Sequence, residues 1–143
     1  MVHISPPEIS DYKTLIQLEK SIFKDSILQH KLKSFENHAA YVIWKIEKTK
    51  IIGFVCFFHV KDEIEIIKIC IAKSHQRKNF GSILINEIKK LKIKKIFLEV
   101  SVLNTNAINF YLKNGFKKIG IRKAYYAGQN MSRIDALRLL FKF

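Results

Sequence analysis

The chain has 143 residues, of which 48% are hydrophobic, and its formal net charge at pH 7 is +14. The apolar content, with 11 Phe residues, excludes a disordered chain and predicts a single domain over residues 1–143 with a core of its own. The charge comes mostly from Lys, which clusters between Lys89 and Lys95. A basic surface attracts polyanions such as RNA. We favour the simpler explanation of a Lys-rich, solvated helix face, because charge alone identifies no partner.

The N-terminal segment and the spacing of Cys and His argue against export, membrane and metal classes. The first ten residues lack the basic start and apolar run of a signal peptide, and no apolar stretch approaches the length of a membrane span. Cys56 and Cys70 are isolated, which fits neither a disulfide framework nor a zinc site, and the five His residues show no metal-ligand spacing. We therefore expect a cytoplasmic protein with no metal ion and no membrane contact.

The first part of the chain predicts a strand, two helices and two strands, in that order. Residues 2–4 form a short strand that ends at a Ser-Pro-Pro sequence. A helix capped by Ser10 or Asp11 follows. The remaining expected elements are a shorter helix over residues 27–35 and strands over 40–46 and 51–60, joined by a polar turn.

The central stretch of the chain predicts a strand, a turn and a helix. The Ile-rich run Glu63–Ile71 predicts the strand, and its apolar–polar alternation slips between Ile66 and Ile67, which indicates a β-bulge. The polar turn Gln76–Ser82 leads into a helix expected over Gly81–Lys92. The free N–H groups and positive dipole of a helix N-terminus attract anions, so we interpret this turn as a pyrophosphate site.

The last part of the chain predicts a strand, a helix, a strand, a loop and a closing strand. The first strand is expected over residues 95–102, and the helix runs from Asn104 to its C-cap at Asn114–Gly115. A strand over 116–121, a loop over 123–132 and the closing strand over 134–143 follow. The complete order, β-α-α-β-β-β-α-β-α-β-β, predicts an α/β fold with a mixed sheet and helices on both faces.

The central turn resembles a family signature. Its residues Q-R-K-N-F-G-S are similar to the (Q/R)-x-x-G-x-(G/A) signature of the GCN5-related N-acetyltransferases, which hold the pyrophosphate of acetyl-CoA there. Asn79 stands where the first glycine is usual, and Asn is the non-glycine residue that best tolerates a positive φ. This turn alone fits an unrelated α/β domain about equally well. The element order resembles the family from end to end, which implies a mixed, mostly antiparallel sheet of about seven strands.

A longer block is more specific. The run L-E-V-S-V-L-N-T-N-A-I-N-F-Y-L-K-N-G-F resembles L-E-V-R-x-S-N-x-x-A-x-x-L-Y-x-x-x-G-F of the RimI-type ribosomal-protein alanine N-acetyltransferases. Arg122–Tyr126 and Ile134–Ala136 are similar to the R-x-Y-Y and D-A of that branch. Ser101, Leu103 and Ala127 depart from its pattern, and these departures bear on the peptide substrate more than on the chemistry.

Glu99 and Tyr111 are the candidate catalytic residues. Glu99 is a carboxylate in a mostly apolar strand, which is costly unless the group is paired or used, although glutamates at the rim of a strand are common. Tyr111 taken alone is more often a core aromatic residue. The family resemblance implies that Glu99 is the general base and that Tyr111 is the general acid toward the leaving thiolate.

The resemblance also implies where the two substrates bind. Tyr125 and Tyr126 are typical of a loop that covers the peptide end in enzymes that acetylate protein N-termini. The residues implied to hold the acetyl, pantetheine and pyrophosphate groups of acetyl-CoA are Ile69, Cys70, Ile71, Arg77, Lys78, Asn79, Phe80, Gly81, Ser82 and Asn104.

We therefore expect an acetyl-CoA-dependent N-acetyltransferase that modifies the N-terminal α-amine of a protein, with the alanine end of a small-subunit ribosomal protein as the leading candidate. Alternatives are a GNAT acetyltransferase for a small-molecule or lysine amine and, in a different class, a basic nucleic-acid-binding module. Polyamines are disfavoured because the chain is so basic. Direct nucleic-acid binding is disfavoured because the aromatic residues are not interleaved with basic ones as stacking platforms.

Overall fold

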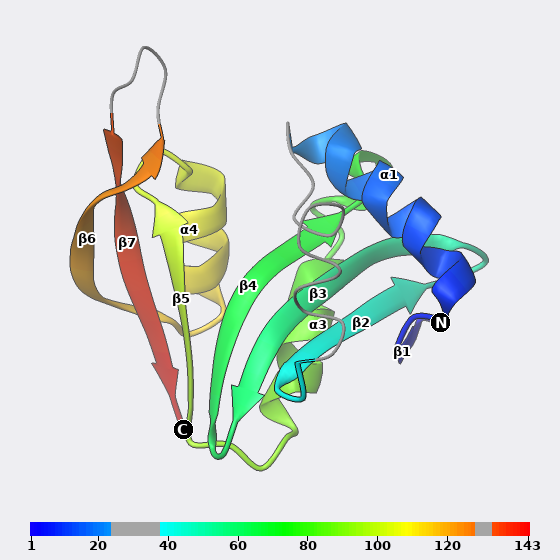
Figure 1. The fold of residues 1–143 in the computed structure, drawn as a ribbon, viewed down its shortest axis with the longest axis horizontal. Helices are drawn as coiled ribbons and strands as arrows, with labels where there is room; N and C mark the ends of the chain where they lie inside the picture. The colour runs from blue at the N-terminus through cyan, green and yellow to red at the C-terminus, as the bar shows by residue number, and fades with distance from the viewer. Residues whose placement is uncertain (24–37, 128–132) are drawn as a thin grey trace. The chain divides into compact units, whose positions relative to one another are not determined.

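The computed structural model describes residues 1–23, 38–127 and 133–143. In these ranges the chain forms one seven-stranded sheet with the strand order β1-β2-β3-β4-β5-β7-β6 (Figure 1). The contacts within the chain define two compact units. Unit 1 comprises Met1–Val60 and Ile66–Leu91, and unit 2 comprises Lys61–Glu65 and Lys92–Phe143.

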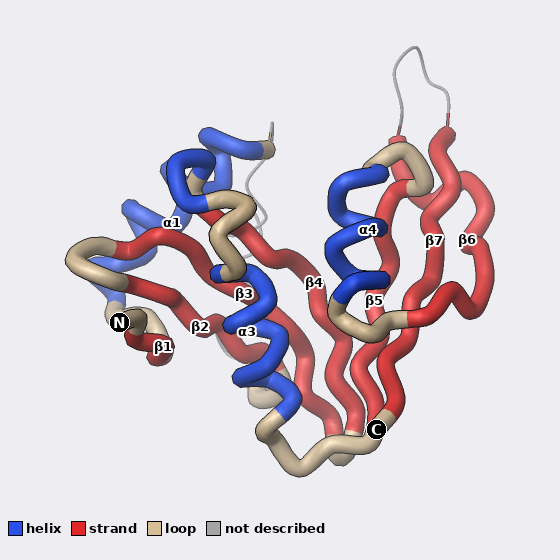
Figure 2. Tube along the Cα trace, turned by 180° about the vertical axis from the view of Figure 1, so that it is seen from behind, coloured by secondary structure: helices blue, strands red, loops and turns tan. Residues whose placement is uncertain are grey.

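Unit 1 is a sheet with a helix on each face. Helix α1 covers one face of β2, β3 and β4, and α3 covers the opposite face, as the two views in Figures 1 and 2 agree. Strands β1, β2 and β3 pair in antiparallel fashion. The elements are β1 (His3–Ser5), α1 (Tyr12–Ile22), β2 (Tyr41–Glu47), β3 (Ile51–Val60), β4 (Glu63–Ile71, whose first three residues belong to unit 2) and α3 (Phe80–Lys89).

Helix α1 is held to the sheet by an apolar cluster and by a buried ion pair. Leu15 is fully buried and packs with Phe54 and Cys70, among others, and burial of one aliphatic side chain contributes roughly 1.5–3 kcal/mol. Glu19, whose side chain is 0% exposed, accepts a hydrogen bond at 2.9 Å from the Nζ atom of Lys68 in β4. These contacts fix the helix over the second half of β4.

Unit 2 contains β5 (Lys95–Ser101), α4 (Thr105–Lys113), β6 (Lys117–Ala127) and β7 (Arg133–Lys142). Strand β7 lies between β5 and β6 and pairs antiparallel with both, whereas β4 and β5 pair in parallel, with Glu65 opposite Phe97. Ile96, Leu98 and Val100 are buried, while the residues that alternate with them are only partly buried. The two faces of β5 are therefore apolar and polar.

The apolar face of β5 lies on the side of α4. Phe141 of β7 pairs in register with Ile96, and its ring lies 5.8 Å from that of Phe116. Phe116 in turn packs against Tyr111 of α4, with ring centroids 5.4 Å apart. Because side chains alternate across a strand, Glu99 lies on the opposite, polar face.

The structure confirms the predicted mixed, mostly antiparallel sheet and corrects several bounds. Helix α3 ends at Lys89, three residues before the expected Lys92. The loop expected over residues 123–132 is wrong in its first part, since β6 continues to Ala127. Asp11 is the N-cap of α1, but its side chain does not cap the helix; it accepts from Glu8 N and from Lys45. The helix expected over residues 27–35 lies outside the described residues.

The bulge predicted between Ile66 and Ile67 stays a prediction, with some support from the contacts of β4. Ile67 packs against the apolar cluster under α1, and the next residue, Lys68, binds Glu19 of the same helix. Consecutive residues of a regular strand point to opposite faces, so contacts of both with the side of α1 fit an irregular strand. None of the helices in the described ranges has the length and apolar content needed to cross a membrane.

Candidate active site

The turn after β4 in unit 1 is held by one side chain and by two left-handed residues. Gln76 donates its side-chain amide to the main-chain carbonyl of Ile71, the last residue of the strand, at 2.9 Å. Arg77 and Asn79 have φ values of 59° and 73°. The positive φ predicted for Asn79 is confirmed, and that of Arg77 was not foreseen. Asn79 is also the N-cap of α3, so the turn continues without a break into this helix.

The start of α3 has the features that favour anion binding. The first N–H groups of a helix, here those of Phe80, Gly81 and Ser82, have no acceptor one turn earlier, and the helix dipole adds positive potential at this end. Arg77 and Lys78 are exposed beside them. Main-chain donors and two cations fit the chemistry of a pyrophosphate, whose oxygens accept hydrogen bonds and carry negative charge. The contribution of these residues to acetyl-CoA binding stays a prediction.

The last three residues of β4 differ in how deeply their side chains are buried. The side chain of Cys70 is 1% exposed and belongs to the apolar cluster under α1. Burial raises the pKa of its thiol to about 12, so the group is a neutral core residue and not a nucleophile. Ile69 and Ile71 are partly buried. A bound pantetheine arm would meet the main chain of Cys70 and not its sulfur.

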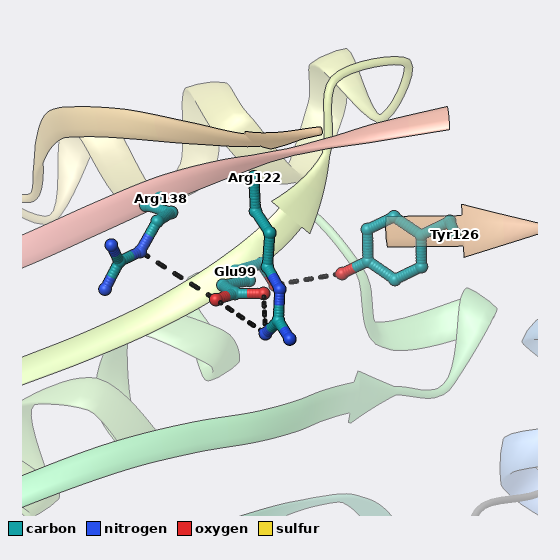
Figure 3. A network of polar contacts seen from close by, with 4 residues as sticks. All are labelled: Glu99, Arg122, Tyr126 and Arg138. Atoms are coloured by element: carbon teal, nitrogen blue, oxygen red, sulfur yellow. Dashed lines mark hydrogen bonds and ion pairs between the residues drawn. The ribbon is translucent and has the colours of Figure 1, made fainter. Parts of the chain in front are cut away.

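Glu99 is the centre of a polar network in unit 2, shown in Figure 3. The Nη1 atom of Arg122 lies 3.4 Å from both carboxylate oxygens, and the Nε atom of Arg138 lies 3.8 Å from Oε1. The carboxylate is 18% exposed, whereas both arginine side chains are about half exposed, at 57% and 50%. These long contacts with half-exposed cations compensate the charge of Glu99 without enclosing it.

A second carboxylate lies on the same face of the sheet. Glu65 is paired in register with Phe97, two residues before Glu99, and side chains two apart on a strand share a face. Burial raises the pKa of Glu65, the charge of Glu99 raises it further, and Arg122 opposes both effects. The polar face of unit 2 therefore brings Glu65 and Glu99 together with the guanidinium groups of Arg122 and Arg138.

Two tyrosines of β6 border this network. The hydroxyl of Tyr126 donates to the main-chain carbonyl of Glu99 at 3.2 Å, and burial raises the pKa of Tyr126 to about 12. Tyr125 is exposed, and the guanidinium of Arg122 stacks over its ring at 4.2 Å from the centroid. The two rings meet edge to face, with centroids 4.8 Å apart. The predicted pair thus lies beside Glu99, although on a strand and not on a loop.

Tyr111 is the buried residue of α4, and Asn104 caps the start of this helix. Tyr111 is 7% exposed and packs edge to face with Phe110 and Phe116, on the face of the sheet opposite to Glu99. Asn104 is the N-cap of α4, and its side-chain oxygen accepts a hydrogen bond from Ala107 N at 3.2 Å. This confirms the predicted cap. The catalytic role of Tyr111 and the contact of Asn104 with the cofactor stay predictions.

The sequence interpretation missed some partners of these residues. Arg138 is one, and its signal was the charged residue that interrupts the apolar closing strand, directly opposite Glu99 in the register. Gln76 was noted as part of the turn, but its bond to Ile71 has no signal in the sequence. Among the described residues no group of three or more His, Cys, Asp or Glu side chains could hold a metal ion.

The structure thus combines a mixed seven-stranded sheet with a turn that leads into a helix N-terminus after its fourth strand and a carboxylate on its fifth. A sequence profile of the acetyltransferase (GNAT) family matches residues 9–116, and the chain belongs to this family. It is an acetyltransferase of a family that uses acetyl-CoA as its donor.

Two relatives resemble the chain along nearly its whole length. The [ribosomal protein bS18]-alanine N-acetyltransferase of Haemophilus influenzae is 29% identical over 138 residues, which cover 94% of each chain. The crystal structure of the ribosomal-protein-S18-alanine N-acetyltransferase from Escherichia coli superposes with a TM-score of 0.82 at 26% identity and covers 99% of this chain and 94% of that one. A chimera of Vibrio cholerae spermidine N-acetyltransferase SpeG and hSSAT has the same TM-score at 23% identity, covers 99% and 95%, and shows the shared fold alone.

Proposed function

We propose that this protein transfers the acetyl group of acetyl-CoA to the N-terminal α-amine of a protein, with the N-terminal alanine of a small-subunit ribosomal protein as the acceptor. The observation that carries the proposal is Glu99, a partly exposed carboxylate on a polar sheet face beside Tyr125 and Tyr126. The full-length similarity to two bS18-alanine N-acetyltransferases supports this choice of acceptor.

The proposed reaction is a direct transfer. A peptide α-ammonium has a pKa of ~7.7–8.0, so a carboxylate such as Glu99 needs to remove only a weakly held proton, directly or through a water molecule. The free amine then attacks the thioester carbon while both substrates are bound. The C–N bond forms, the C–S bond breaks, and the thiolate leaves with a proton. No covalent enzyme intermediate is needed, which agrees with the buried, neutral state of Cys70.

The two arginines near Glu99 fit this role. Before the acceptor binds, Arg122 and Arg138 compensate the carboxylate on a partly buried face. Their contacts are long and their side chains are half exposed, so an incoming ammonium group can replace one of them at little cost. The ammonium group then forms an ion pair with Glu99 in place of that arginine, and it lies within reach of the carboxylate that removes its proton.

Tyr111 is proposed as the acid that protonates the departing thiolate. Its ring lies on the face of unit 2 opposite to Glu99. In the proposed transfer Glu99 serves the amine nitrogen and Tyr111 serves the sulfur. The two roles require opposite protonation states at one pH.

The cofactor is assigned to unit 1. The pyrophosphate of acetyl-CoA would lie on the main-chain N–H groups at the start of α3, next to Arg77 and Lys78, and its pantetheine arm would follow Ile69–Ile71. Main-chain N–H groups freed by an irregular strand near Ile67 would stabilise the oxyanion that develops on the thioester.

The experiment that tests the proposal is a peptide panel. The purified protein is incubated with acetyl-CoA and with peptides that share one ribosomal-protein-like sequence but begin with Ala, Ser, Gly or Met. Mass spectrometry of each product reads the site of transfer. We expect the Ala peptide to be the best acceptor and a peptide with a blocked N-terminus to remain unmodified. Equal acetylation of the blocked and free peptides contradicts the proposal.

A further inference from the structure

Strand β6 contains a large bulge beside Glu99. In the register of β6 and β7, Arg122 is opposite Ala136 and Tyr126 is opposite Ile134. Three residues of β6, Lys123 to Tyr125, therefore face the single residue Asp135 of β7. Bulges commonly re-aim side chains near active sites, and this one begins and ends with a residue that contacts Glu99.

Asp135 binds the centre of the bulge. Its Oδ1 atom accepts a hydrogen bond from the main-chain N–H of Ala124 at 2.8 Å, and its Oδ2 atom lies 3.3 Å from the Nζ atom of Lys123. The main-chain carbonyl of Asp135 also accepts from Val102 N, at 3.1 Å, just after β5 ends. One residue of β7 thus links the bulge to the strand that carries Glu99.

The backbone at Ala124 requires such support. Its φ is 52°, in the left-handed region that a residue with a Cβ atom enters only when its surroundings hold it there. The charge-assisted hydrogen bond from Ala124 N to Asp135 supplies much of that hold, and Arg133 Nε donates a second hydrogen bond to Ala124 O at 3.1 Å. The bond from Ala124 N lowers the pKa of Asp135, with Lys123 contributing, so the carboxylate remains ionised well into the acidic range.

We propose that Asp135 is a positioning residue for the acetyl transfer: by holding the left-handed turn at Ala124, it places Arg122 and Tyr126 against Glu99. This inference rests on the proposed function of Glu99 as the base. Without the carboxylate, the bulge relaxes, the guanidinium of Arg122 leaves the carboxylate of Glu99, and the hydroxyl of Tyr126 leaves its carbonyl. The acceptor site loses its shape, while the cofactor site in unit 1 does not.

Four variants separate positioning from general destabilisation. Asp135→Ala removes the acceptor for Ala124 N, Asp135→Asn keeps an oxygen at the same place, and Lys123→Ala removes only the exposed ion pair. The double variant Asp135→Ala/Ala124→Gly removes the carboxylate but lets glycine take the left-handed conformation unaided. Circular dichroism at the assay temperature identifies any variant that fails to fold.

The first readout is kinetic. For Asp135→Ala we expect kcat/KM toward the Ala peptide to fall by about tenfold or more, because misplaced groups near a reacting centre are costly, with the KM for acetyl-CoA within about twofold of wild type. Asp135→Asn and Lys123→Ala should stay within about threefold, and the double variant should recover part of the loss. Equal losses for both substrates, or no loss, would overturn the inference.

The second readout does not depend on activity. Amide hydrogen exchange of Ala124, followed by NMR, should be faster in Asp135→Ala by about tenfold and close to wild type in Asp135→Asn. The phenol of Tyr126, titrated through its ring carbon signal, should have its high pKa lowered in Asp135→Ala, because release from burial favours the ionised form. Unchanged exchange and titration overturn the inference even if no N-terminal acetylation is found in the wild type, so the two failures are distinguishable.

Discussion

Tyr126 donates its hydroxyl to the main-chain carbonyl of Glu99 at 3.2 Å, and this bond ties the end of β6 to the middle of β5. The two residues are 27 apart in the sequence, and the strand between them in the sheet is β7. The bond therefore crosses over a neighbouring strand. It sets the orientation of the tyrosine ring beside the carboxylate and makes the hydroxyl a donor that must stay protonated.

The stability of the protein should depend on this phenol at high pH. The pKa of Tyr126 is raised from the model-compound value of 10.0 to about 12, chiefly by burial, with Tyr125 and Glu99 adding to the effect. Between these two values the unfolded state loses the proton and the folded state keeps it, so stability falls as the pH rises above about 10. In Tyr126→Phe the part of this loss that comes from Tyr126 is absent. Chemical denaturation of both proteins from pH 8 to 11 checks it; parallel curves would show that Tyr126 is not linked to folding.

The phosphate site predicts a large effect at Gly81 and a small one at Asn79. Gly81→Asp places bulk and negative charge at the start of α3, so acetyl-CoA affinity measured by calorimetry should fall by about tenfold or more. Asn79→Gly is the matched control: position 79 has φ 73°, which glycine adopts freely, and its affinity should be unchanged or slightly higher. If Gly81→Asp binds acetyl-CoA like the wild type, the pyrophosphate lies elsewhere.

Glu99→Gln should keep acetyl-CoA affinity and lower turnover. General-base catalysis is typically worth about 10²–10⁴-fold, and the loss should be largest at pH values below the pKa of the acceptor amine, where most of the amine is protonated. A pH series of initial rates with the Ala peptide measures it. A mutant rate within about twofold of wild type across the series would make Glu99 a structural residue at the rim of the sheet.

The buried ion pair between α1 and β4 predicts a stability effect away from both sites. Lys68→Ala removes one partner of Glu19, whose side chain is 0% exposed, and breaking a buried ion pair costs about 3 kcal/mol because the remaining charge is buried. Lys90→Ala is the control, since its ion pair with Glu87 is exposed and contributes at most about 0.5 kcal/mol. Urea denaturation compares the two. A loss below about 1 kcal/mol for Lys68→Ala would mean that water reaches Glu19 readily.

The sequence predicted best where burial sets the pattern. The bounds of β3 and β4 were predicted correctly because both are dense in β-branched and aromatic residues. The second half of β6 was missed because it lies at the edge of the sheet, where exposed residues show no alternation. Its bulge depends on a bond from Ala124 to Asp135, eleven residues away, which no local pattern encodes.

In the candidate site, too, the residues with a local signal could be predicted, and their distant partners could not. Glu99 could be singled out because a carboxylate in an apolar strand is unusual, and Asn79 because a turn of this kind needs a positive φ. The arrangement of Arg122 and Arg138 around Glu99 required the register of three strands. A sequence indicates which residues are out of place locally, whereas their partners follow only from strand pairing.

The last prediction concerns the kind of amine that accepts the acetyl group. A lysine side chain has a pKa of ~10.4, so at neutral pH its deprotonation costs roughly 3 kcal/mol more than that of an α-amine. Tyr125 and Tyr126 also suit a chain end, which can enter head-on, better than a lysine flanked by backbone.

We therefore expect transfer to the α-amine of an Ala peptide and little transfer to a lysine within the same peptide. Two matched peptides test this, one with a free N-terminus and no lysine, the other with a blocked N-terminus and one internal lysine. Rates are compared from pH 6.5 to 9.5. The free peptide should react faster at every pH, and its rate should level off at about pH 9, where the α-amine is mostly deprotonated, while any reaction at lysine keeps rising. Acetyl groups found mainly on lysine would leave an acetyltransferase of the GNAT family with a different acceptor.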